Sequence, residues 1–388
     1  MITRKLILFT AFLLGGAFLS GCGVFSSAVQ NVTGLVGLGR TGTIINKAWI
    51  RSSYAVVAAD LLEVKRGESL DILDEIDFEK VRWYRVRAHD EVSTEGWIEA
   101  QNVIIEELLE KSKKIAEEDK DIPQQAIGQL RAATNLRLSP EQRDDNIIVK
   151  LDNLSNDKPQ SFEIISWKYV QKTQEVIDID DVRRGEQKQV RRTTKNAELE
   201  AAKEANEPEK MDEKYDIWYK VRLARSVSPA PSGWLFGRQV ELQLPNDIVF
   251  YQNNNKKFIA WQRLDNIESN DKPVLGDTGT VKVSKPGSWV ILSRSNIVKA
   301  KDGVEPDFDG ILVLAYDKYN EEYYTAFRSG EVWGLLPLLV EGTGDNKTFT
   351  VKLHKAENQL AEYRFVVYKD KNRLKVNAPP DIPKGENK

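Results

Sequence analysis

A repeated pair of short motifs constrains the fold of this 388-residue chain more than any other feature. Residues 83–87 read WYRVR and are followed by GWI at 96–98, while residues 218–222 read WYKVR and are followed by GWL at 233–235. Aromatic and β-branched residues favour strands, in which successive side chains point to opposite faces. The repeat therefore predicts two related β modules.

Alternation within each first motif separates two faces. Tyr84 and Val86 point one way, as Tyr219 and Val221 do in the second copy, and these residues suit a buried face. We expect the Trp of each copy to share the solvent-facing side with two cations, where rings and cations can meet a ligand. An open alternative is that the Trp rings pack under a neighbouring loop. The candidate ligand-binding residues are Trp83, Arg85, Arg87, Trp218, Lys220 and Arg222.

Further motifs surround the repeat. A glycine precedes the second Trp of each copy, as is common where strands bend or backbones approach in small closed sheets. Residues 48–51 (AWIR) align with 134–137 (TNLR), and 65–73 (KRGESLDIL) read as a turn that leads into a strand. Together these motifs resemble the bacterial SH3-like (SH3b) domain family over residues 43–104. The resemblance implies a small barrel of the kind that binds cell-wall peptides or glycans.

The second copy, residues 128–245, departs from this pattern. No clear Lys-Gly-Glu turn precedes its Trp pair, and its motifs are spaced further apart, which indicates an insertion at 171–214. A barrel tolerates such a loop because closure entropy grows slowly with loop length. The insertion is polar and mixed in charge, so we favour a solvated surface extension; contact of its arginine pairs with an acidic partner is the alternative.

The N-terminus has the form of an export signal. A cationic start at residues 4–5 precedes an apolar run at 6–18, which is too short for a comfortable bilayer span. The sequence LSGC follows at 19–22 and resembles the lipobox of bacterial lipoproteins. This resemblance implies that residues 1–21 are a signal peptide and that Cys22 is lipid-modified and becomes the first residue of the mature chain.

Residues 22–42 then read as a lipid-anchored tether with a mean reach of roughly 25 Å. More than one acyl chain on Cys22 holds a protein stably in a membrane. Gly23 lacks the aspartate that retains some lipoproteins in the inner membrane, so we expect the outer membrane, facing the periplasm. The tether contains G-x-G-x-x-G at 37–42, but no strand precedes this motif and an extended stretch follows it, so no dinucleotide cofactor is predicted.

Residues 105–127 are charged and favour a helical linker, with Glu107 and Glu110 each four residues before a lysine. A partner-binding amphipathic helix is the alternative. Residues 246–377 contain strand-like runs separated by turns and predict a β-barrel or β-sandwich of about eight strands. Residues 378–388 hold three prolines and are expected to be disordered. The predicted fold class is all-β: two small SH3-like barrels joined by a short helical spacer, plus the C-terminal β domain.

Composition narrows the range of functions that this chain can have. The net charge is −3, which disfavours a general grip on nucleic acid, and the single cysteine excludes both an intramolecular disulfide and a cysteine-based metal cluster. Only two histidines are present, and no catalytic motif occurs in a suitable context, so we predict neither a metal site nor an enzyme. A glycosidase-type carboxylate pair needs no local motif and stays a remote alternative.

Two hypotheses lead. The first is a lipid-anchored envelope protein whose SH3-like modules bind peptidoglycan or its peptides. The second is a structural or assembly subunit that binds other envelope proteins.

Overall fold

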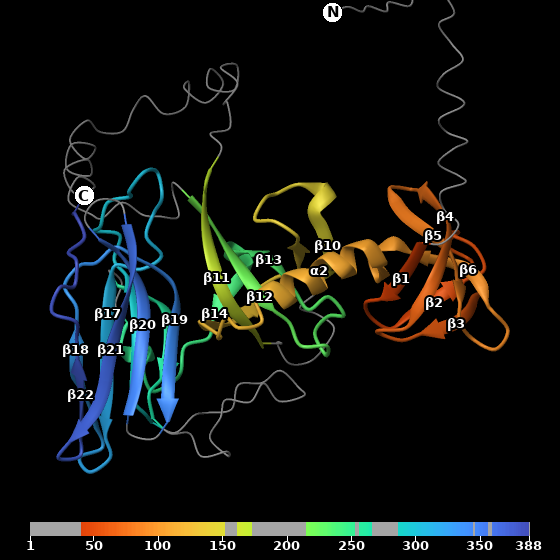
Figure 1. Cartoon of the computed structure of the whole chain (residues 1–388). Coiled ribbons are helices and arrows are strands. Elements are labelled where there is room, and N and C mark those ends of the chain that lie inside the picture. The colour runs from red at the N-terminus through yellow and green to blue at the C-terminus, as the bar shows by residue number, and fades with distance from the viewer. Residues whose placement is uncertain are drawn as a thin grey trace, which may run out of the picture.

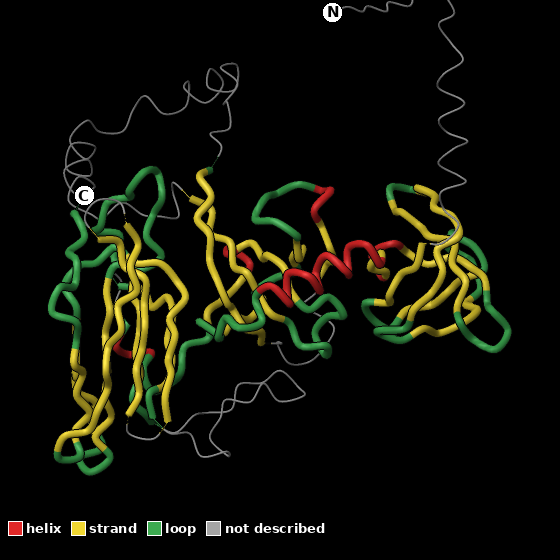
Figure 2. Tube along the Cα trace, viewed as in Figure 1, coloured by secondary structure: helices red, strands yellow, loops and turns green. Residues whose placement is uncertain are grey.

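The structure is a computed structural model that describes residues 40–151, 161–172, 215–252, 256–265, 286–343, 346–355 and 359–387. The predicted signal peptide, Cys22, most of the tether and residues 173–214 of the predicted insertion lie outside these ranges. Within them the chain is mostly antiparallel β-sheet with one α-helix, α2 (Glu106–Glu118), which confirms the all-β prediction. Three β bodies lie in a row, and α2 bridges the first two (Figures 1 and 2).

The first body, here called the first module, is a seven-stranded antiparallel sheet in the order β3-β2-β6-β5-β4-β1-β7. A single-turn 3-10 helix, η1 (Ala100–Asn102), follows β6. The strands are β1 (Arg40–Ile44), β2 (Ala48–Arg51), β3 (Asp60–Val64), β4 (Ser69–Phe78), β5 (Val81–Ala88), β6 (Glu95–Glu99) and β7 (Val103–Ile105).

The second module is also a seven-stranded antiparallel sheet, in the order β10-β9-β13-β12-β11-β8-β14. A 3-10 helix, η4 (Gly237–Gln239), follows β13 at the place that η1 takes after β6. The strands are β8 (Ala126–Leu130), β9 (Thr134–Arg137), β10 (Ile147–Leu151), β11 (Ser161–Gln171), β12 (Tyr215–Arg222), β13 (Ser232–Phe236) and β14 (Val240–Leu242).

The two modules have one topology, because each strand of the first corresponds to the strand seven numbers later in the second. Their registers agree as well. Val86 lies opposite Gly96 and Val221 opposite Gly233, and Trp83 lies opposite Glu99 as Trp218 does opposite Phe236. The sequence repeat therefore marks a duplicated seven-stranded unit.

The glycine of each GW motif lies where another strand passes closely. A Cβ at Gly96 would lie 2.5 Å from the carbonyl oxygen of Arg51, and one at Gly233 would lie 2.8 Å from that of Arg137. Only glycine fits between these backbones, because real Cβ contacts are not this short. The predicted close backbone approach is confirmed in both copies.

The third body consists of two four-stranded antiparallel sheets, β15-β16-β17-β18 and β19-β20-β21-β22, packed face to face over a shared apolar core. It has the eight strands that the sequence predicts, within the described residues. The strands are β15 (Lys257–Arg263), β16 (Trp289–Arg294), β17 (Gly310–Asp317), β18 (Glu322–Arg328), β19 (Gly334–Thr343), β20 (Asn346–Lys355), β21 (Gln359–Asp370) and β22 (Arg373–Asn377).

The predicted disorder of residues 378–388 is wrong for residues 378–387. Ile382 packs against the core of the third body, the Gly385 amide donates to Glu331 O at 2.8 Å, and the Lys299 amide donates to Glu386 O at 2.8 Å. The prolines of this segment remove backbone donors but do not prevent it from lying along the sheets.

Helix α2 packs on the second module through a narrow face. Leu109 is buried in the core of that module, and the buried Ser112 hydroxyl donates to Ser232 O at 2.5 Å. The predicted Glu107–Lys111 pair forms at 2.6 Å, whereas Glu110 pairs with Lys113 instead of Lys114. The partner for the apolar face of α2 is therefore this chain's own second module.

Gln125 fastens the second module to the third body. Its buried side chain accepts the Leu338 amide at 2.7 Å and donates to Leu338 O at 3.1 Å, while its carbonyl accepts the Trp261 amide at 3.0 Å. The Arg294 guanidinium lies 5.3 Å from the centre of the Tyr169 ring, which adds a cation–π contact. The second module and the third body also share one continuous apolar core.

We predict that Gly233→Ala lowers the free energy of unfolding by roughly 1–3 kcal/mol, the usual cost of overpacking, because its Cβ would collide with the Arg137 backbone. Gly330→Ala is the control, since a Cβ there meets no atom within 4 Å. Urea unfolding followed by tryptophan fluorescence measures both. Equal stabilities of the two variants would contradict the packing explanation.

Candidate ligand-binding groove

The predicted solvent exposure of the two motif tryptophans is wrong. Trp83 is 6% exposed and Trp218 is 2% exposed, so neither ring offers an open stacking surface. Tyr84 and Val86 are buried as predicted, and so are Tyr219 and Val221. Both faces of the motif strand are therefore covered at the Trp position.

A 3-10 helix lies close to each buried Trp. η1 contacts β5, and η4 contacts β12. η1 directly follows Glu99, which pairs with Trp83, and η4 directly follows Phe236, which pairs with Trp218. In the second module the Phe236 ring also packs on Trp218, with ring centres 5.2 Å apart. The burial of both rings agrees with the alternative that they pack under a neighbouring loop.

The two cations of the first motif are exposed but already paired. Arg85 Nη2 donates to Glu95 Oε2 at 3.1 Å, and Arg87 Nη2 donates to Glu95 Oε1 at 2.7 Å. Hydrogen bonds from Arg87 and Arg85 lower the pKa of the Glu95 carboxyl below its ordinary value. The Glu95 carboxylate on β6 thus forms ion pairs with both arginines.

The cations of the second motif hold the C-terminal end of α2. Lys220 forms an ion pair with Asp119, the residue that ends the helix, and both side chains are largely buried. Arg222 binds Glu163 at 2.8 Å and donates to the carbonyl oxygens of Asp119 and Ile122 at 2.9 and 3.1 Å. Positive charge at a helix C-terminus offsets the helix dipole, so these residues join the helix to the second module.

A groove of about 400 Å³ opens on the second module beside Trp218 of the motif, and its lining combines rings, amides and cations. Strands β9, β10, β12 and β13, the η4 turn and the loop after β9 contribute to it. The groove is lined by Ala133, Thr134, Asn135, Arg137, Gln142, Lys150, Trp218, Phe236 and Gln239.

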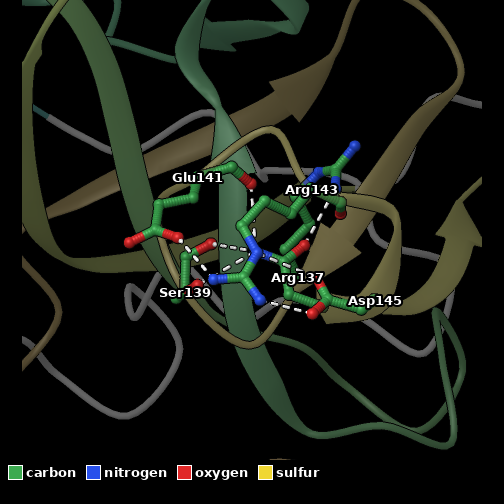
Figure 3. Close-up of polar contacts among 6 residues, drawn as sticks. Arg137, Ser139, Glu141, Arg143 and Asp145 are labelled. Atoms are coloured by element: carbon green, nitrogen blue, oxygen red, sulfur yellow. Dashed lines mark hydrogen bonds and ion pairs between the residues drawn. The ribbon is translucent and has the colours of Figure 1, made fainter.

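Arg137 gives the groove a fixed cation. Its Nη1 donates to Asn146 Oδ1 at 2.8 Å and to the Arg143 carbonyl. Asn146 in turn donates to Ser139 Oγ at 2.9 Å and to Glu141 O at 3.0 Å. Figure 3 shows Arg137 within this polar network. The network orders the loop between β9 and β10.

Arg137 stays positively charged in the groove. Burial lowers the pKa of its guanidinium below the ordinary value, and Asp144 partly opposes this effect. Arginine keeps its charge at any physiological pH. Among the described residues, no carboxylate lies within ion-pair distance of Arg137 or of the exposed Lys150.

Comparison of the two modules shows why only the second has this lining. Trp49 lies opposite Glu63 in the first module, whereas Asn135 lies opposite Lys150 in the second. The bulky ring and the acid are therefore replaced by a small amide and a cation. Asn135, Arg137 and Lys150 were not predicted as a site from the sequence, although the alignment of residues 48–51 with 134–137 already contained the Trp-to-Asn difference.

The groove lining is better suited to binding a ligand than to catalysing a reaction. None of the nine lining residues is Asp, Glu, His or Cys, so the groove supplies neither a carboxylate pair nor a strong nucleophile. Two cations beside amide groups and a ring favour an anionic ligand with polar and apolar parts. Elsewhere in the described residues, no group of three or more His, Cys, Asp or Glu side chains is arranged to hold a metal ion. No helix of that same part of the chain is long and apolar enough to span a membrane.

Carboxylates of the third body gather beside the second module, but each has an internal partner. Glu305 Oε2 accepts Arg294 Nη2 at 2.7 Å, and Asp309 accepts the Ser295 amide at 2.8 Å. Asp307 accepts the Leu336 amide at 2.9 Å. Burial raises the pKa of Asp307 to about 6. These contacts assign the three carboxylates to the packing of the third body.

We predict that Lys220→Met lowers the free energy of unfolding by roughly 2 kcal/mol, because Asp119 then stays largely buried at the end of α2 without its cation. The control is Arg85→Met at the same position of the first module, where the side chain is exposed. Thermal unfolding should show a clear loss for the first variant and little change for the second. Equal effects would contradict the helix-joining role of Lys220.

Asp307→Asn tests the buried carboxyl. A folded-state pKa raised from 3.8 to about 6 means that the folded chain holds the proton more tightly than the unfolded chain. The ionised carboxylate therefore lowers stability progressively as the pH rises from about 4 to about 6, and the full loss persists at higher pH. We expect Asp307→Asn to raise the free energy of unfolding by about 2–3 kcal/mol at pH 7.5 and to have little effect near pH 4. A gain of equal size at both pH values would exclude the charge as its cause.

No protein-family model matches this chain, and a comparison with curated proteins also finds no match. The two modules of this chain are nevertheless related to each other, because their sheets have equivalent strand orders. Their shared topology makes each module a reference for the other, and Asn135 and Lys150 of the groove lining stand where the first module has Trp49 and Glu63.

Proposed function

We propose that this chain is a lipid-anchored binding protein of the bacterial cell envelope and that the groove of its second module binds a carboxylate-bearing peptide of the peptidoglycan type. The observation that carries this proposal is the groove lining, which contains Arg137 and Lys150 but no acidic residue. The Lys150 ammonium group and the fixed Arg137 guanidinium can each bind a carboxylate. Phe236 offers a ring for the apolar part of a peptide.

The envelope location rests on the sequence. LSGC at 19–22 follows a short apolar run, and the cysteine of that motif is the single cysteine of the chain. The duplicated seven-stranded module supports the resemblance to SH3b domains, whose members bind cell-wall peptides or glycans. Of the contact residues first expected, only Trp218 lines the groove, and it is almost fully buried there. Trp83 is buried and the cations of both motifs have internal partners, so the proposal moves the contact to Asn135, Arg137 and Lys150.

A second candidate is an assembly subunit that binds other envelope proteins. The short 3-10 helix η5 (Val249–Tyr251), which lies before the third body, supports it. Phe250 is 88% exposed there, with Val249 and Tyr251 partly exposed on either side. Exposed apolar patches of this kind mark protein contacts.

Co-sedimentation of the full chain with purified peptidoglycan tests the first candidate. We expect Lys150→Gln to weaken binding about tenfold, the loss typical of one charge-assisted hydrogen bond. Asn135→Trp, which places in the second module the residue that the first carries at Trp49, should close the groove and abolish binding. Arg137 is left intact because it orders its own loop.

Arg131→Gln is the matched control, because Arg131 is an exposed cation of the same module outside the groove. A stem peptide with free carboxylates should compete with peptidoglycan, and the same peptide with amidated carboxyl groups should not. Normal binding by both groove variants would exclude the groove as the site. Failure of the unaltered chain to co-sediment would favour the assembly subunit.

A further inference from the structure

The first module carries an uncharged projecting loop between β2 and β3. The apolar loop, residues 52–59, reads SSYAVVAA and contains no charged residue in a chain of which 30% is charged. Val56 is 80% exposed and Val57 is 93% exposed at its tip. Two adjacent valines held in water are unfavourable unless something covers them.

Hydrogen bonds hold this loop in a defined conformation. Arg51 Nη2 donates to Val56 O at 3.0 Å and to Ala58 O at 3.1 Å. The Ala59 amide donates to Ser52 Oγ at 3.0 Å. These bonds fix the loop backbone while the two valine side chains point outward, so the exposure of the tip is a property of the fold.

Neighbouring side chains extend the apolar surface. Trp49 of β2 and Leu61 of β3 lie on either side of the loop in the sequence, and they are 45% and 46% exposed. The charges at the edge cancel in pairs, since Lys47 binds Glu63 at 2.7 Å and Arg51 binds Asp60 at 3.4 Å. The surface is therefore apolar and without net charge.

The loop lies at the end of the module where the described chain begins. Arg40 of β1 forms an ion pair at 3.4 Å with Glu75 of β4. Glu75 lies three residues before Phe78. The Phe78 ring in turn packs on Tyr54 of the apolar loop, with centres 5.0 Å apart. Cys22 is eighteen residues before Arg40 in the sequence, so an anchor on Cys22 can lie no further than roughly 60 Å from this end even if fully extended.

We propose that the apolar loop inserts into the surface of the membrane to which Cys22 is anchored, so that the first module rests on the lipid. This inference relies on the lipid anchor of the proposed function. A tethered loop needs little affinity of its own, because the anchor already holds it near the lipid surface at high effective concentration. Since the loop and its edge carry no net charge, contact requires no anionic lipid and resists salt.

The test uses the full acylated chain with Val57→Cys, reconstituted in phosphatidylcholine vesicles. Acylation of Cys22 leaves the introduced cysteine as the one reactive thiol for an environment-sensitive fluorophore. We expect a blue shift and a several-fold rise in emission in vesicles, unchanged by high salt. Val92→Cys is the matched control, because Val92 is 80% exposed in the loop at the opposite end of β5 and should keep its aqueous emission.

The outcomes separate the loop from the anchor. Flotation with vesicles but no shift at position 57 overturns the membrane contact and leaves the anchor intact. Failure to float, as expected for Cys22→Ser, overturns the anchor and the loop contact together. A shift that appears without vesicles and grows with protein concentration assigns the loop to a second copy of this chain and overturns the proposal. Unchanged thermal unfolding of the labelled variants confirms that the fold is intact.

Discussion

The cations of β12 hold the C-terminal end of α2, and the continuity of the molecule depends on this contact. Lys220 neutralises Asp119 in a largely buried pair, and Arg222 donates to the carbonyl oxygens of Asp119 at the end of the helix and of Ile122 just beyond it. Because the same helix follows β7 of the first module and buries Leu109 in the second, the two modules are connected by a packed element. Gln125 and the shared core continue that connection into the third body.

Duplication gave two modules with one topology and different surfaces. In the first, Arg85 and Arg87 share Glu95 and contribute little to packing, whereas the equivalent residues of the second hold a helix. The groove position differs in the same way, with Trp49 and Glu63 in one module and Asn135 and Lys150 in the other. The framework that both modules keep consists of the close strand approach at the GW glycine and the buried Trp beside a 3-10 turn.

The proposed roles follow from where each module lies along the row. The first module, nearest to the proposed anchor, has an uncharged loop that suits lipid, while the second has a cationic groove that suits an acidic wall peptide. A chain arranged in this order would hold its ligand site away from the membrane and toward the wall. The third body packs on the second module through Gln125 and Tyr169 and so stiffens the part that carries the groove.

The sequence alone predicted the all-β class, the repeat, the helical spacer and the eight strands of the third body, because strand alternation, glycine placement and charge spacing are local properties. It misplaced Trp83 and Trp218, since alternation tells which face a residue takes but not what later covers that face. It did not reveal that Lys220 and Arg222 have internal partners, because Asp119 and Glu163 lie far away from them in the chain. Pairing across such distances, and the groove that a small Asn135 leaves open, are decided only when the strands close into a sheet and the helix packs on it.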